Sequence, residues 1–183
     1  MRRSTRIIPK RAIFVGTEGL SERGFAGFVQ HCCTNAGIRV HLQIKVGNGG
    51  DSLSVVEDAV RNLRGHSHGR EFSSRLVLLD HDRLAQDQQA GRDPTGLAHS
   101  HNIQLVFQKP NLEGLFIRLH SGQERRSISA GTTSTELRKV WPEYKKPPTA
   151  QNLIRRFSLC DLQRAARYDS ELQELLEIVG LKP

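Results

Sequence analysis

Leu76-Val77-Leu78-Leu79-Asp80-His81-Asp82 is the stretch that decides the fold, because a continuous apolar run leads directly into two acidic residues. A short apolar run of this kind, without helical spacing, is typical of a strand that is buried on both faces of a sheet. A second such run, Ala12-Ile13-Phe14-Val15, is followed by Gly16-Thr17-Glu18. Strands buried on both faces belong to parallel sheets covered by helices, so the sequence predicts an α/β fold.

The hydrophobic pattern alternates between helices and strands around these two runs. Helical periodicity predicts helices over residues 25–33 and 53–63, and Asp51 is expected to cap the second of them. Strict alternation predicts a strand over residues 38–46, and a further apolar run predicts one over residues 103–107. The order β-α-β-α-β-(α)-β-α predicts a mainly parallel sheet of about four strands with right-handed crossovers.

Polar segments separate the later elements. We expect a short helix at residues 84–89, followed by a loop around residues 91–96. Pro110 fits the first turn of a helix with an apolar face. Residues 121–136 are rich in Ser, Thr and Gly and predict a long loop, which in a compact domain is often functional.

The chain divides into three parts. Residues 1–11 predict a basic N-terminal arm, residues 12–146 an α/β domain, and residues 147–183 a helical C-terminal segment. In the last helix of that segment, a capping box is expected to begin at Ser170, and Gly180 is expected to end the helix.

The charge balance concerns partners rather than fold. Lys and Arg number 27 against 19 Asp and Glu, which gives a formal net charge of +8. Such an excess favours a polyanionic partner, DNA or RNA, although a basic surface also serves solubility alone. The side chains expected to hold a nucleic-acid backbone are Arg118, Arg125, Arg126, Lys145 and Lys146.

Cysteine usage and hydropathy restrict the setting. The chain has 3 cysteines and no C-x-x-C pair, so no zinc ribbon is expected and the pattern fits a reducing cytoplasm. No apolar segment follows the basic N-terminus, and no apolar run reaches the length of a membrane span. We therefore expect neither a signal peptide nor a membrane partner.

Acidic residues follow both central strands. Glu18 follows the first strand, and Asp80 and Asp82 follow the third, at the sheet edge where open parallel sheets bind ligands. If these strands are neighbours, the carboxylates converge, and a cluster of carboxylates recruits a cation or has raised pKa values. Oxygen ligands predict Mg²⁺, with Mn²⁺ as an alternative. If the chain stays extended, Asp80 and Asp82 point to one side and His81 away.

Three further residues have two interpretations each. Glu22 either completes a second metal site or is an acid in the first turn of a helix, where the helix dipole favours it. Glu113 is a further ligand or, as we favour, a helix cap. Lys109 stabilises negative charge on a phosphate in the transition state or is a solvated loop lysine.

These motifs resemble a known family. Glu18-Gly19-Leu20-Ser21-Glu22, followed by a strand that ends in Asp80-His81-Asp82, resembles the Toprim pattern of topoisomerases, bacterial primases and the OLD nucleases. The first of these is similar to the E-G-x-[ST]-E signature of the OLD-like branch. Residues 49–56, 110–113 and 141–146 resemble segments of the RloB-like proteins in the same order, over roughly residues 10–150. Here, however, the proline precedes the asparagine in residues 110–113, and a leucine stands where an aromatic is usual.

The resemblance implies a Toprim-like fold, Mg²⁺ at the acids and a role in prokaryotic defence beside an ATPase partner. Our hypothesis is a metal-dependent nuclease in which an ion bound by Glu18, Asp80 and Asp82 activates a water that attacks a phosphodiester. The alternative is a non-catalytic metal- or nucleic-acid-binding subunit of a defence complex. Receiver and phosphatase domains usually place Asp after the first strand, so Glu18 argues against them. Tyr144 and Tyr168 lie outside the expected catalytic core, which argues against strand passage by a nucleophilic tyrosine.

Overall fold

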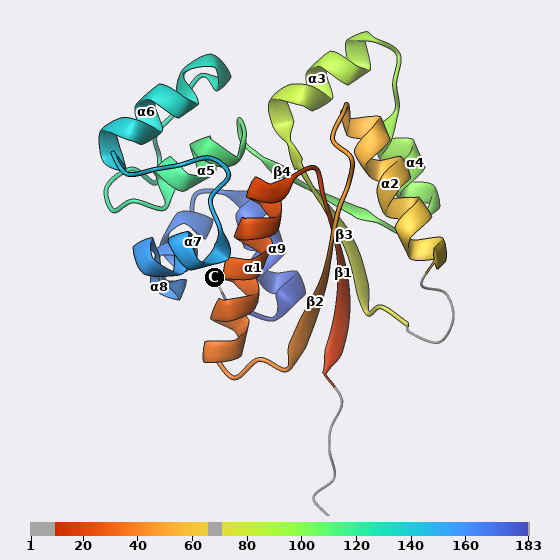
Figure 1. Ribbon diagram of the computed structural model, residues 1–183, viewed down its shortest axis with the longest axis horizontal. Coiled ribbons are helices and arrows are strands. Elements are labelled where there is room, and N and C mark those ends of the chain that lie inside the picture. Colours follow the sequence, from red (N-terminus) through yellow and green to blue (C-terminus); the bar gives the residue numbers. More distant parts are fainter. Residues whose placement is uncertain (1–9, 66–70, 183) are drawn as a thin grey trace, which may run out of the picture.

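A sheet of four parallel strands forms the centre of the computed structural model, which describes residues 10–65 and 71–182 (Figure 1). Its strands, in the order β2-β1-β3-β4, are β2 (Val40–Val46), β1 (Arg11–Thr17), β3 (Ser74–Asp80) and β4 (Gln104–Gln108). All three neighbouring pairs are parallel. The predicted fold class is therefore confirmed: an α/β fold with helices flanking a parallel sheet and a helical C-terminal part, consistent with a Toprim-like fold.

The register between β1 and β3 positions the acidic residues. Thr17 pairs with Leu78, so the next residue after β1, Glu18, and the last residue of β3, Asp80, lie at the same edge of the sheet. The sequence left open whether these strands are neighbours, and the structure shows that they are. The carboxyl ends of all the strands meet at this edge because the sheet is parallel.

Helices cover both faces of the sheet (Figure 1). Alternate β1 side chains point to opposite faces, so Ile13 and Val15 belong to the larger hydrophobic core and Phe14 to the smaller one. The larger core also contains residues of α1 (Leu20–Asn35), α5 (Leu112–Arg118), α6 (Thr133–Val140), α7 (Ala150–Arg156), α8 (Leu159–Ala166) and α9 (Ser170–Val179). The smaller core contains residues of α2 (Ser52–Gly65) and α4 (Pro94–Ser100). No helix in the described part of the chain is long and apolar enough to cross a membrane.

The expected N-terminal arm and C-terminal segment are not separate from the α/β domain in the described part of the chain. Residues 1–9 of the arm lie outside the described residues, but Arg11 belongs to β1, and its Nη2 donates to the Ile178 carbonyl of α9 at 2.7 Å. In the C-terminal segment, Leu153 and Leu176 are fully buried in the core that also contains β1 and β3 side chains. The segment therefore completes the α/β domain.

Several segments expected to be loops are helical. Helix α3 (His81–Gln89) begins directly after β3, three residues earlier than the expected 84. Helix α4 begins inside the loop expected at residues 91–96 and takes up its second half, and Asp93 caps the helix by accepting the Gly96 N–H at 2.8 Å. The loop expected at residues 121–136 gives way to the short η1 helix (Ala130–Thr132) and then to α6. Asp93-Pro94 is typical of the start of a helix, but Gly91 and Gly96 on either side led to the prediction of a loop.

The helix caps divide into correct and wrong predictions. Asp51 accepts the Ser54 N–H at 2.8 Å, and Gly180 ends α9 with a left-handed φ of 89°, both as expected. Asp169, rather than Ser170, caps α9 by accepting the Leu172 N–H at 3.1 Å. Pro110 lies before α5 instead of in its first turn, because Asn111 is the cap.

Candidate functional site

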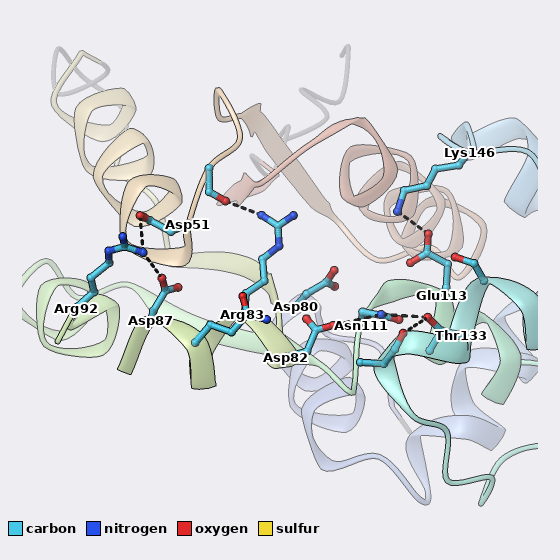
Figure 2. A pocket seen from close by; sticks show the side chains of 14 residues that line it. Asp51, Asp80, Asp82, Arg83, Asp87, Arg92, Asn111, Glu113, Thr133 and Lys146 are labelled. Atoms are coloured by element: carbon cyan, nitrogen blue, oxygen red, sulfur yellow. Dashed lines mark hydrogen bonds and ion pairs between the residues drawn. The ribbon is translucent and has the colours of Figure 1, made fainter. Parts of the chain in front are cut away.

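A polar pocket of about 580 Å³ lies at the carboxyl edge of the sheet, between α3 and the start of α5 (Figure 2). Asp80 and Asp82 line it together with Glu113, and three basic side chains, Arg83, Arg92 and Lys146, also face it. The pocket is where the sequence placed the candidate site, at the ends of adjacent parallel strands.

Asp80 is the carboxylate whose ionisation the site disturbs most. Its backbone is extended, and its Oδ1 accepts the N–H of Leu112 at 2.9 Å. Burial, followed by the nearby carboxylates of Glu22, Asp82 and Glu18, raises the pKa of Asp80 to about 7, although the bond from Leu112 opposes this. Side chains from β3, α3, α1 and the end of β1 therefore gather closely enough for their negative charges to interact.

Glu18 lies in the same electrostatic cluster. Burial raises its pKa, Arg83 counteracts this, and Glu22 and Asp82 raise it further. Its Oε1 lies 2.5 Å from Nη1 of Arg83, and its side chain is only 16% exposed. Glu18 is thus a largely buried carboxylate whose nearest positive charge comes from α3.

Asp82 reaches the pocket by a different route from the one expected. Because α3 begins at His81, Asp82 lies in the first helical turn, and the prediction that Asp80 and Asp82 alternate along an extended strand is wrong. His81 does turn away, and its ring meets Phe107 edge-on at 5.9 Å between centroids. The Asp82 carboxylate accepts a long bond of 3.4 Å from Nδ2 of Asn111.

Glu22 and Glu113 are both buried, and Glu22 lies in the first turn of α1, as one of its two interpretations expected. The Oε2 of Glu22 accepts the Gly19 N–H at 3.0 Å, so Glu22 caps α1, and its role as a ligand remains a prediction. The favoured interpretation of Glu113 as a cap is wrong, because Asn111 caps α5 by accepting the Gly114 N–H at 3.1 Å. Glu113 instead faces the pocket, and its Oε1 forms an ion pair with Nζ of Lys146 at 2.7 Å.

Tyr144 and Lys146 bring the late part of the chain into the site. Tyr144 is buried, and its hydroxyl donates to Oε1 of Glu113 at 3.3 Å. This tyrosine therefore lies next to the site, whereas the sequence placed it outside the expected catalytic core. Burial, and then the Glu113 charge, raises the pKa of Tyr144, which keeps the hydroxyl protonated. Burial opposes the charge on Lys146, but its bond to Glu113 prevails and raises the pKa of this lysine, which remains a cation.

Lys109 does not line the acidic pocket. Its Nζ pairs with Oε1 of Glu171 at 3.1 Å, and it lines a separate pocket of about 250 Å³. Lys146 rather than Lys109 is therefore the lysine next to the carboxylates. Composition and spacing did not distinguish these two, because the segment that carries Lys146 reaches the site only through tertiary packing.

Three of the four remaining residues of the predicted nucleic-acid surface lie together, outside the acidic pocket. Arg118 is buried and pairs with Asp169 at 2.7 Å, so its guanidinium is engaged inside the protein. Arg126 pairs with Glu136, and Arg125 stacks over the Tyr168 ring at 4.5 Å from its centroid. Lys145 is exposed. Arg118, Arg125 and Arg126 line the same small pocket as Lys109, apart from the acids.

The donor set fits a hard divalent cation by its chemistry. Glu18, Asp80 and Asp82 offer oxygen ligands only, and Mg²⁺ typically takes one or two carboxylates and keeps several waters. In residues 10–65 and 71–182, no three Asp, Glu, His or Cys side chains are already arranged as a metal-binding group. Arg83 contacts Glu18 in this arrangement, so a cation that binds there requires side-chain movement.

Arg83, Arg92 and Asn111 are site residues that sequence analysis missed. Arg83 directly follows Asp82, and its proximity to the acids was the available signal. Asn111 is a favoured cap residue directly before an apolar helix, a signal that the preceding proline obscured. Arg92 was missed because its partner Asp51 is distant in the sequence, although its second partner, Asp87 of α3, lies nearby in the chain.

Comparison with models of known families, with curated proteins and with solved structures gives no match for this chain. The resemblance to the RloB-like proteins therefore remains a prediction from the motifs. The parallel sheet and the gathered acids stand on the structure itself.

Proposed function

We propose that this protein is a Mg²⁺-dependent phosphodiesterase of the Toprim class, a nuclease that acts on DNA or RNA. One observation carries the proposal: Glu18 and Asp80 lie at the ends of the neighbouring parallel strands β1 and β3, with Asp82 in the first turn of α3, so that partly buried carboxylates gather at one edge of the sheet and raise the pKa of Asp80 to about 7. Carboxylates that lie this close together repel one another, and a bound cation relieves the repulsion while it leaves them ionised. In line with the RloB-like motifs, we place this activity in prokaryotic defence, in the cytoplasm and beside an ATPase partner.

The residues that would hold Mg²⁺ are Glu18, Asp80 and Asp82, with Glu22 available for a second ion and Mn²⁺ as an alternative metal. When bound, the ion supplies an activated water and stabilises the leaving oxygen of the phosphodiester. The Leu112 N–H fixes Oδ1 of Asp80 at 2.9 Å, which leaves Oδ2 for a ligand.

Basic side chains of the pocket would attract and orient the phosphodiester. Arg83, Arg92 and Lys146 line the pocket together with the acids, so positive charge surrounds the position of the carboxylates. Glu113 holds the Lys146 ammonium at 2.7 Å, and Tyr144 fixes Glu113 in turn. A cation that is held in place, as Lys146 is, stabilises negative charge that develops on a phosphate. Lys146 is therefore our candidate for the role expected of Lys109.

The test is cleavage of plasmid DNA, linear DNA and RNA by the purified protein with Mg²⁺ or Mn²⁺. Asp80→Asn and Glu18→Gln are expected to lower the rate by at least about a hundredfold, as the removal of one strong transition-state interaction does. Glu143→Gln is the matched control, because Glu143 is an exposed acid whose loss changes the net charge equally. Cutting that persists unchanged in Asp80→Asn would refute the proposal.

The second candidate is a non-catalytic cation- or nucleic-acid-binding subunit. The Arg83–Glu18 contact favours it, because a structural ion pair already compensates one of the acids. This candidate predicts that the protein binds Mn²⁺ or nucleic acid but cuts neither DNA nor RNA, also when an ATPase partner is added. Cleavage that requires Asp80 would exclude it.

A further inference from the structure

Arg83 joins two elements at the rim of the acidic pocket. Its Nη1 lies 2.5 Å from Oε1 of Glu18, just beyond β1, and donates at 2.5 Å to the carbonyl of Gly50, in the glycine-rich loop before α2. Figure 2 shows its side chain extending from α3 toward this backbone carbonyl rather than toward Asp82. The same nitrogen makes both contacts, so Arg83 links the end of β1 to the loop before α2.

The ion pair is asymmetric in exposure. The Arg83 side chain is 44% exposed, whereas that of Glu18 is 16% exposed. Arg83 is long and has no other acidic partner within the described residues, so it can leave by rotation into the open pocket. Glu18 cannot follow it into water and lies among other carboxylates, so it needs a replacement for the positive charge.

A divalent cation on Glu18 competes with Arg83 for the same oxygen. An ion that coordinates Oε1 of Glu18 on the side that Nη1 now contacts takes the place of that nitrogen. Two positive charges at that spacing also repel each other. A cation that binds this side of Oε1 therefore displaces the guanidinium of Arg83.

We infer that Arg83 is the exchangeable counter-ion of Glu18: its guanidinium neutralises the carboxylate when no cation is present and yields it when a divalent cation binds. The inference rests on the proposed function, whose metal site it regulates. Arg83 acts through Glu18 and is thus a positioning residue. It keeps the empty site assembled, at the cost of a lower apparent affinity for the cation.

Arg92 is a natural control in the same pocket. It also carries one positive charge and lines the pocket, and it is exposed to the same degree, 45%. It pairs with Asp51 at 3.1 Å and with the buried Asp87 at 3.0 Å, not with Glu18. Arg92→Gln therefore removes the same charge from the pocket without freeing Glu18.

The experiment measures Mn²⁺ binding by calorimetry and by electron paramagnetic resonance, without nucleic acid. Removal of a partly exposed competing ion pair is expected to tighten Mn²⁺ binding by about threefold to fivefold in Arg83→Gln. Arg83→Lys, which keeps a cation, and Arg92→Gln are expected to stay near wild type. Thermal unfolding of each variant in the metal-free state verifies that it is folded.

The outcomes separate this inference from the proposed function. If the wild type binds Mn²⁺, Asp80→Asn does not, and Arg83→Gln gains nothing over wild type, only the role of Arg83 is refuted. An equal gain in Arg92→Gln also refutes it, because it would assign the effect to net charge. If no variant binds Mn²⁺, the metal site and the role of Arg83 both fail.

Discussion

The Asp80 carboxylate, at the end of β3, is tied to the first turn of α5 by the N–H of Leu112, which donates to Oδ1 at 2.9 Å. This bond favours the ionised form of Asp80, yet burial and the neighbouring carboxylates outweigh it and raise the pKa to about 7. The acid is thus fixed in place by the fold but is electrostatically unfavourable once it is ionised.

The first prediction concerns stability and pH. The folded pKa of Asp80, about 7, lies above the ordinary value of 3.8, so the folded state binds the proton more tightly than the unfolded state. Stability from this group is therefore present below about pH 4 and is lost as pH rises toward 7. In EDTA, Asp80→Asn should raise Tm by about 3–6 °C at pH 8, corresponding to 1–2 kcal/mol, with little gain at pH 4.

The asparagine keeps an oxygen that accepts the Leu112 N–H, so the substitution removes the charge and leaves that bond. Glu143→Gln, at an exposed position, serves as the control and should show no such pH dependence. A gain in Tm that is the same at pH 4 and pH 8 would assign the effect to something other than the ionisation of Asp80.

The second prediction concerns the affinity for the cation. A metal ion binds the ionised carboxylate, so a cation and the proton compete for Asp80. With a pKa of about 7, Mn²⁺ affinity should increase by roughly tenfold between pH 6 and pH 8 and then level off. Calorimetry in buffers of different ionisation enthalpy should also detect proton release near pH 7. An affinity that does not change over this range would contradict the binding of the cation by an Asp80 carboxylate with a pKa of about 7.

The sequence predicted what depends on local pattern and on parallel topology. Continuous apolar runs identified β1 and β3, and the rule for ligand sites in parallel sheets then placed Glu18 and Asp80 at one edge. The start of α3 was missed, because the residues Asp80-His81-Asp82 fit both the extended end of a strand and the first turn of a helix. Only tertiary contacts, such as the Asp82 N–H to Pro110 carbonyl bond of 3.0 Å, decide between them.

The cations of the site were harder to predict than the acids. Lys109 directly follows the strand β4 and Lys146 lies in a polar segment, so topology favoured Lys109. The structure pairs Lys109 with Glu171 and brings Lys146 to Glu113 instead. A long lysine side chain can reach several neighbouring acids, so its ion-pair partner depends on where distant segments of the chain pack rather than on strand order.

The third prediction concerns the packing that delivers Lys146 to the pocket. A Cβ on Gly24 of α1 would lie 2.1 Å from the Pro148 carbonyl oxygen, which is backbone and cannot rotate away. Gly24→Ala should therefore displace the segment that carries Lys146 and destabilise the protein by about 1–3 kcal/mol, as overpacking does. Gly131→Ala is the control, because a Cβ there meets nothing within 4 Å. Thermal unfolding measures both, and equal Tm values for the two variants would contradict the close packing.

The fourth prediction separates structural from surface arginines. Arg118 and Asp169 form a pair of buried side chains at 2.7 Å, and Asp169 also caps α9. Arg118→Ala leaves the Asp169 charge buried without its partner and should cost about 3–5 kcal/mol of stability. Arg125→Ala, at an exposed position over Tyr168, should cost less than about 1 kcal/mol. Denaturant unfolding measures both costs, and salt-dependent binding to a duplex oligonucleotide should be weakened by Arg125→Ala if the surface holds a phosphate backbone. A stable Arg118→Ala variant that loses nucleic-acid binding would instead assign Arg118 to the surface role that the sequence suggested.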